Sequence, residues 1–136
     1  MLILGVDYGR RRVGVATGNL ETGNCTPLTV LSPKDSVSWR KLFARWQPGL
    51  CVVGLPLSMD GSMSLMGWEA CAFARRLALD FDQSIVLADE RLSTASVRVD
   101  LELAQGKNFA GPIDDLAAAR ILSAWLCDYA LTKSEP

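Results

Sequence analysis

Three acidic residues stand at positions where a carboxylate needs a partner. Asp7 and Glu90 each follow an apolar segment, and Asp114 precedes one. An unpaired carboxylate at the end of a buried strand is costly, so it needs a hydrogen-bond donor, an arginine or a cation. If the three side chains converge, their mutual repulsion favours a cation at the same point.

A site made only of carboxylate oxygens favours a hard cation, Mg²⁺ or Mn²⁺. Two such ions about 4 Å apart can activate a water molecule and stabilise the leaving oxygen of a phosphodiester. The chain contains no histidine, which excludes Ser-His-Asp and Cys-His nucleophiles and the usual general base at neutral pH. Metal-assisted phosphodiester hydrolysis needs no histidine and is therefore compatible with this chain.

Each acid also has an ordinary structural interpretation. Asp7 could cap a turn and pair with the arginines Arg10–Arg12, which is as good an explanation as a functional one. Glu90 alone is better explained as a surface acid paired with Arg91. Asp114 alone has the position of a helix N-cap.

The basic residues after Asp7 are candidates for phosphate contacts. Arg10, Arg11 and Arg12 would lie at the rim of the same site, where guanidinium groups can hold phosphates bidentately. Taken alone, they are typical of an exposed turn. The segment "GLPLSMDG" could offer backbone N–H groups and Ser58 to a phosphate, but it lacks the lysine of a P-loop.

Composition bounds the class of protein. The chain has 136 residues, of which 49% are hydrophobic, so we expect one compact domain over residues 1–136. It has no signal-peptide pattern and no apolar run long enough for a bilayer, which predicts a cytoplasmic protein without a membrane partner. The four cysteines are widely spaced and are expected to be reduced core thiols. A net charge of -1 means that any nucleic-acid contact must be a local basic patch.

The hydrophobic pattern predicts a meander of three strands followed by strands that alternate with helices. The expected strands are residues 2–6, 13–16, 26–31, 50–54 and 84–88. Helices are expected to begin at Asp35 or Ser36, at about Ser64, near the segment "STASV" and at Asp114 or Asp115. This order predicts an α/β domain whose ligands lie beyond the carboxyl ends of the strands.

Four motifs in this order resemble the RuvX/YqgF family: "GVDYGRRRVGVA", "VVGLPLSMDG", "DERLST" and "IDDLAAARILSAWL". Its members are Holliday-junction-resolvase-like proteins that are also assigned as pre-16S rRNA nucleases. The resemblance covers nearly the whole chain. It implies an RNase H-like α/β fold, with a five-stranded mixed sheet whose first three strands are antiparallel and which is flanked by helices.

The resemblance also implies a metal site. The family's metal-binding and catalytic acids fall on Asp7, Glu90 and Asp114, which would hold Mg²⁺ or Mn²⁺. The neighbouring acids Asp89 and Asp115 do not match the family's catalytic positions.

Three arginines match positions expected near the scissile phosphate: Arg11, Arg12 and Arg91. The chain departs from the family before the last acid, where basic residues are usual. It carries "NFAGPI" there, and Lys107 is the nearest base. Fewer phosphate contacts would weaken nucleic-acid binding and reduce its salt dependence.

These features predict a metal-dependent nuclease that hydrolyses phosphodiester bonds in RNA during 5′-end maturation of pre-16S rRNA in the pre-ribosome. One alternative is a Holliday junction resolvase that acts on branched DNA. Another is a non-catalytic RNA-binding module of ribosome assembly that keeps the fold. Both a monomer and a homodimer are compatible with the sequence.

Overall fold

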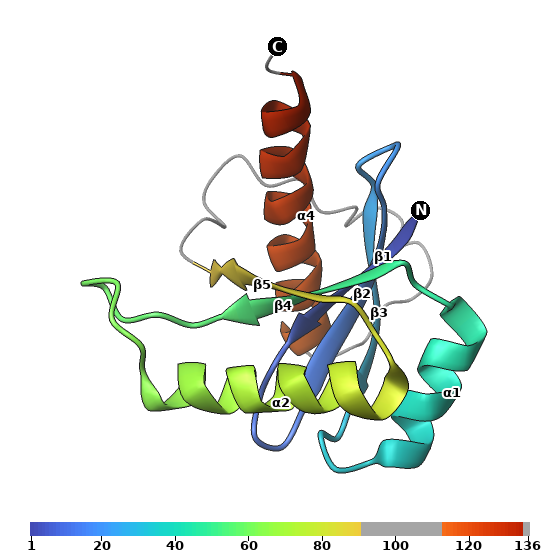
Figure 1. Ribbon diagram of the computed structural model, residues 1–136, viewed down its shortest axis with the longest axis vertical. Coiled ribbons are helices and arrows are strands. Elements are labelled where there is room, and N and C mark those ends of the chain that lie inside the picture. Colours follow the sequence, from blue (N-terminus) through green and yellow to red (C-terminus); the bar gives the residue numbers. More distant parts are fainter. Residues whose placement is uncertain (91–112, 135–136) are drawn as a thin grey trace.

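A computed structural model describes residues 1–90 and 113–134, with the backbone alone for 113–116 and 131–134 (Figure 1). In this part, five strands form one mixed sheet in the order β3-β2-β1-β4-β5. The strands are β1 (Leu2–Asp7), β2 (Val13–Asn19), β3 (Cys25–Leu31), β4 (Leu50–Leu55) and β5 (Ile85–Asp89). The first three are antiparallel, and β4 and β5 continue the sheet parallel to β1. The predicted strand arrangement is confirmed.

The central strand β1 is apolar from Leu2 to Val6, as expected for a strand in a sheet whose two faces are both covered by helices. Its partner β2 is three residues longer than predicted and ends at Asn19. The extension has a clear cause, since Leu2 pairs with Asn19 and Asp7 with Gly14, so that β2 follows β1 from end to end.

Helices α1 (Ser36–Trp46) and α2 (Leu65–Phe81) cover one face of the sheet, and α4 (Ile113–Ser134) covers the other (Figure 1). Trp39 of α1 and Phe73 of α2 are buried against β1 and β4, whereas Ala118 and Leu122 of α4 lie in a separate core cluster. The helix predicted near "STASV" lies outside the described residues. None of the described helices is both long and apolar enough to cross a membrane.

Glycines let α4 approach the sheet closely. A Cβ on Gly5 would lie 2.7 Å from Leu122 Cβ and 2.9 Å from the Ala118 carbonyl oxygen, and a Cβ on Gly18 would lie 2.8 Å from Leu122 Cδ2. Gly18 is paired with the start of β1 and also contacts Leu126. Contacts therefore move toward the start of α4 as β1 proceeds, which means that the helix runs antiparallel to this strand.

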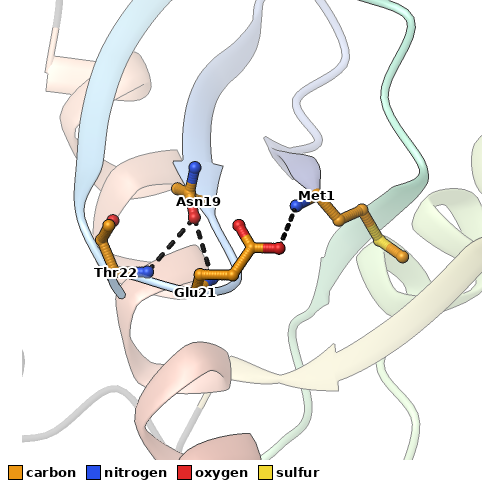
Figure 2. A network of polar contacts seen from close by, with 4 residues as sticks. All are labelled: Met1, Asn19, Glu21 and Thr22. Carbon is orange, nitrogen blue, oxygen red and sulfur yellow. Dashed lines mark hydrogen bonds and ion pairs between the residues drawn. The ribbon is translucent and has the colours of Figure 1, made fainter.

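The β2–β3 turn is tied to the N-terminus by polar contacts (Figure 2). Asn19 Oδ1 accepts hydrogen bonds from the backbone N–H groups of Glu21, at 2.8 Å, and Thr22, at 3.2 Å. The Met1 ammonium group donates to Glu21 Oε1 at 2.7 Å. Because Asn19 pairs with the start of β1, this network fixes the end of the sheet opposite to Asp7.

The prediction of four core thiols is wrong in part. Cys25 and Cys51 are buried, Cys71 is half-buried on α2, and Cys127 is exposed on α4; all four are free thiols. The difference at Cys127 follows from helix geometry, because the sheet-facing residues of α4 include Leu122 and Leu126 and leave the next position turned outward.

Candidate active site

Asp7 and Glu90 meet at the carboxyl ends of two strands that are not neighbours. Asp7 is the last residue of β1, and Glu90 directly follows β5. Strand β4 lies between them, yet the Glu90 side chain is hydrogen-bonded to Asp7. The structure thus brings together two of the three acids singled out in the sequence.

The contact is possible because the intervening strand carries a glycine at this level. A Cβ on Gly54 would lie 2.8 Å from Glu90 Oε1 and 2.5 Å from Ile121 Cδ1. Sequence reasoning assigned no role to Gly54. The available signal was a glycine at the end of the apolar run "LCVVG", where close approach of another group is a common reason for glycine in a strand.

The electrostatics of the pair favour a neutral or cation-bound state. Burial raises the pKa of Glu90, the hydrogen bond with Asp7 opposes that rise, and the negative charge of Asp89 adds to it. Two carboxyl groups in contact can form a hydrogen bond only if one holds a proton. A cation between them would remove the need for that proton.

Both side chains belong to the face of the sheet that α4 covers. Ile3 and Ala88 are buried beneath α4, and alternation along the strands places Asp7 and Glu90 on the same side as these residues. Asp114 is the second residue of α4, so it lies within the first turn rather than at the cap position. Among the side chains that the structure describes, no group of three His, Cys, Asp or Glu residues could hold a metal.

The first arginine after Asp7 has its partner on another element. Arg10 turns to α2, where its Nε–H donates to Glu69 Oε2 at 2.8 Å. Arg11 and Arg12 are exposed in the β1–β2 turn. Arg91 lies outside the described residues. Arg10 is therefore held by Glu69, and two of the three predicted phosphate-contacting arginines, Arg11 and Arg12, are exposed to solvent.

The backbone N–H groups of Ser58, Gly61 and Gly67, in the loop between β4 and α2 and at the start of α2, are not available to bind a phosphate. The Ser58 N–H donates to the Ser62 carbonyl at 2.9 Å, and the Gly61 N–H donates to the Ser58 carbonyl at 2.8 Å. The Gly67 N–H, in the first turn of α2, donates to Ser64 Oγ at 3.0 Å. These N–H groups are already bonded within the loop and the helix cap, so the structure does not support the phosphate-binding interpretation.

The chemistry of the Asp7–Glu90 pair is that of a hard-cation ligand set. Two carboxyl groups at the end of the sheet offer oxygen donors, which suit Mg²⁺ or Mn²⁺ rather than a softer metal. A cation and a proton compete for the same carboxyl oxygens, so cation binding at this pair is coupled to proton release.

Comparison with known proteins identifies the family of this chain. The model of the RuvX family, described as Holliday junction resolvase, matches residues 1–128. A relative from Pseudomonas paraeruginosa, named "Putative pre-16S rRNA nuclease", is 43% identical over 135 residues, covering 94% of this chain and 93% of the relative. A relative of the same name from Azotobacter vinelandii is 42% identical over 134 residues, covering 93% and 94%.

Solved structures support the fold. The structure of Thermus thermophilus RuvC in complex with a Holliday junction substrate matches with a TM-score of 0.65 at 14% identity, covering 98% of this chain and 97% of that one. The yeast mitochondrial Holliday junction resolvase matches with a TM-score of 0.60 at 11% identity, covering 98% and 80%. At these identities the likeness concerns the fold, and the predicted RNase H-like architecture is confirmed.

Proposed function

The chain belongs to the RuvX family, and from this premise we propose that it is a metal-dependent nuclease that hydrolyses phosphodiester bonds in RNA during 5′-end maturation of pre-16S rRNA. The family confirms the broader prediction of a hydrolase that acts on phosphodiester bonds. The name of the relatives supports RNA as the substrate. The metal and the maturation step are our proposals.

The observation that carries the proposal is the contact between Glu90 and Asp7 across Gly54. Two acids from separate strands are brought together at the carboxyl end of the sheet, where open α/β sheets bind their ligands. Without a cation, this arrangement holds a half-buried carboxyl group with a raised pKa, which is a pattern common at functional sites.

The direction of α4 supports Asp114 as the third ligand. Gly5 lies against Ala118, and the helix runs antiparallel to β1. Moving two residues along the strand, from Gly5 to Asp7, covers about 6.6 Å. Moving four residues back along the helix, from Ala118 to Asp114, covers about 6 Å. The backbone of Asp114 is thus at the same level as Asp7, on the face to which Asp7 belongs.

Each residue has a defined task in this proposal. The carboxylates of Asp7, Glu90 and Asp114 would hold the cation, which would take the place of the proton that a hydrogen bond between Asp7 and Glu90 requires. The divalent ion supplies a Lewis acid that polarises the phosphate and lowers the pKa of a bound water molecule. Arg11 and Arg12, exposed beside Asp7, orient the strand through its phosphates, and Arg91 directly after Glu90 has the same proposed role.

The test compares Asp7→Asn with Asp35→Asn. Asp35 is an exposed acid that caps α1 through the Ser38 N–H at 3.1 Å, and asparagine caps helices equally well. Cleavage of a 5′-labelled pre-16S rRNA fragment is followed in Mg²⁺, and binding of Mn²⁺ is measured by calorimetry. We expect Asp7→Asn to abolish cleavage and to weaken Mn²⁺ binding while RNA affinity and fold are retained. Cleavage by Asp7→Asn at the wild-type rate would rule out the proposed site.

The same titration separates an enzyme from a non-catalytic RNA-binding module. A wild-type chain that binds no Mn²⁺, or binds it equally well after Glu90→Gln, would favour the module. Competition between the rRNA fragment and a four-way DNA junction addresses the family's description as Holliday junction resolvase. Faster cleavage of the junction by a dimeric protein would favour the resolvase.

A further inference from the structure

A second polar site lies on the opposite side of the sheet from the acids. A hollow of about 190 Å³ is formed between the β1–β2 turn, the segment after β3 and helix α2. Its apolar wall contains Tyr8 and Phe73, whose ring centroids are 5.2 Å apart. This volume is far larger than a single water molecule requires.

Charged residues from three different elements line the hollow. They comprise three cations, Arg10, Lys34 and Arg76, and one carboxylate, Glu69. Within the described part of the chain, Lys34 and Arg76 form no ion pair. The hollow therefore carries an excess of positive charge in a protein whose net charge is -1.

Glu69 positions Arg10 without using up its donors. The Arg10 Nε–H donates to Glu69 Oε2 at 2.8 Å and to Oε1 at 3.2 Å. A guanidinium group has five N–H donors, so four remain on the terminal nitrogens. A guanidinium held in this way loses less freedom when it binds an anion.

The hollow is close to the acids in sequence but lies on the other face of the sheet. Tyr8 directly follows Asp7 and packs on Phe73, on the face covered by α1 and α2. Asp7 and Glu90 belong to the face covered by α4. A nucleic-acid strand that reaches both sites must cross the end of β1, so a phosphate in the hollow is not the one attacked.

An exposed tryptophan lies one helical turn before a residue that lines the hollow. Trp68 is 62% exposed and precedes Ala72, which lines the hollow, by one turn of α2. Basic grooves with neighbouring aromatic side chains are typical of single-strand binding, because each nucleotide offers a phosphate and a flat base. A free phosphate would need no such ring.

We propose that the hollow formed by Arg10, Lys34 and Arg76 binds a backbone phosphate of the single-stranded substrate, away from the scissile bond, while an unpaired base stacks on Trp68. This inference rests on the proposed nuclease function. It assigns substrate binding to residues outside the acidic pair and the Arg11–Arg12 turn. Phosphate binding in the hollow would also compensate for the basic residues that this chain lacks before Asp114.

The test is RNA binding in EDTA, where cleavage cannot interfere. A fluorescent single-stranded RNA is titrated with wild type, with Lys34→Gln/Arg76→Gln and with Lys41→Gln/Arg45→Gln. The last variant loses the same charge from two exposed residues of α1. We expect the hollow variant to bind roughly tenfold more weakly at moderate salt and its salt slope to fall by about 1. The α1 variant should bind like wild type.

Equal losses in the two double variants would show that only net charge matters and would overturn the proposal. Competition with inorganic phosphate distinguishes a site for RNA backbone phosphates from a site for free phosphate. If phosphate binds the hollow without displacing RNA, the hollow is a small-anion site and the proposal is wrong. If Trp68→Ala leaves RNA affinity unchanged but turns a dimer into a monomer, Trp68 contacts a second copy of the chain instead of a base.

Measuring cleavage in Mg²⁺ beside RNA binding tests this inference and the proposed function separately. If the hollow variant binds RNA like wild type while Asp7→Asn loses cleavage, the hollow is not a binding site and the nuclease assignment stands. If the hollow variant loses RNA binding while Asp7→Asn still cleaves, the hollow is supported and the proposed metal site is wrong.

Discussion

The Glu90 side chain is hydrogen-bonded to Asp7 across Gly54 of the strand between them. The two acids end β1 and follow β5, which are separated by β4 in the sheet. Their contact therefore depends on the lack of a side chain at Gly54 as much as on the acids themselves.

Gly54→Ala should separate the two carboxyl groups. The new Cβ would lie 2.8 Å from Glu90 Oε1 and 2.5 Å from Ile121 Cδ1, so both side chains must move. We expect a loss of stability of about 1–3 kcal/mol, as for other overpacked sites, together with a large loss of Mn²⁺ affinity and cleavage. Thermal unfolding and calorimetric titration measure the two effects.

Gly18→Ala is the matched control. Its Cβ would lie 2.8 Å from Leu122 Cδ2, so it also crowds α4, but it meets no carboxyl group. It should reduce stability and leave Mn²⁺ affinity unchanged. Equal losses of Mn²⁺ affinity in both variants would mean that packing of α4, rather than the approach of Glu90 to Asp7, controls the site.

Glu90→Gln should stabilise the protein in EDTA at neutral pH. The pKa of Glu90 is raised above its ordinary 4.5, chiefly by burial. The stability gained from its protonated form is fully present below about pH 4.5 and is lost as pH rises through the folded-state pKa. Glutamine is neutral throughout, so the Tm of the variant should match wild type near pH 4 and exceed it near pH 8.

The comparison variant is Glu69→Gln, which removes an exposed ion pair with Arg10 and should change Tm little at any pH. Adding Mg²⁺ should reverse the order at neutral pH, because a ligand that binds only the folded wild type raises its Tm. A Glu90→Gln variant that is never more stable than wild type in EDTA would contradict the cost assigned to burying this carboxylate.

The cysteines should differ in reactivity by position. Burial raises the pKa of Cys25 to about 12 and that of Cys51 to about 12, whereas Cys127 is exposed. Because the thiolate is the nucleophile, a thiol reagent near pH 8 should label Cys127 first, and label Cys25 and Cys51 only after unfolding. Mass spectrometry of labelled peptides identifies the sites. Labelling of Cys51 in the native protein would contradict its burial beneath α1 and α2.

Ser64→Ala should weaken the start of α2. Ser64 Oγ accepts from the Gly67 N–H at 3.0 Å and donates to the Pro56 carbonyl at 2.9 Å, so it joins the helix to the end of β4. We expect a loss of about 1 kcal/mol in the free energy of unfolding. Ser62→Ala removes an exposed hydroxyl that donates to Asp60 and should cost less. Urea denaturation of both variants checks the difference.

Local patterns predicted most of the strands and helices. The runs around β1 and β4 are apolar because both faces of the sheet are covered, and Asp35 begins α1 as a cap. Predicted ends differ where pairing decides them, as in β2, which continues to Asn19 because β1 offers partners up to that residue. The burial predicted for Cys127 is wrong because the cysteine residue type carries little information about which side of a helix it occupies.

The sequence by itself predicted the family and the class of enzyme, a hydrolase of phosphodiester bonds, from acids at strand ends, the absence of histidine and four motifs that resemble one family. It could not determine which groups meet. Arg10 was a natural partner for Asp7 by proximity along the chain, yet it pairs with Glu69 on α2. Only the tertiary structure brings Glu90 to Asp7, because that contact requires the order of the strands and the empty space at Gly54. Neither the strand order nor the space at Gly54 is a local property of Asp7 or Glu90.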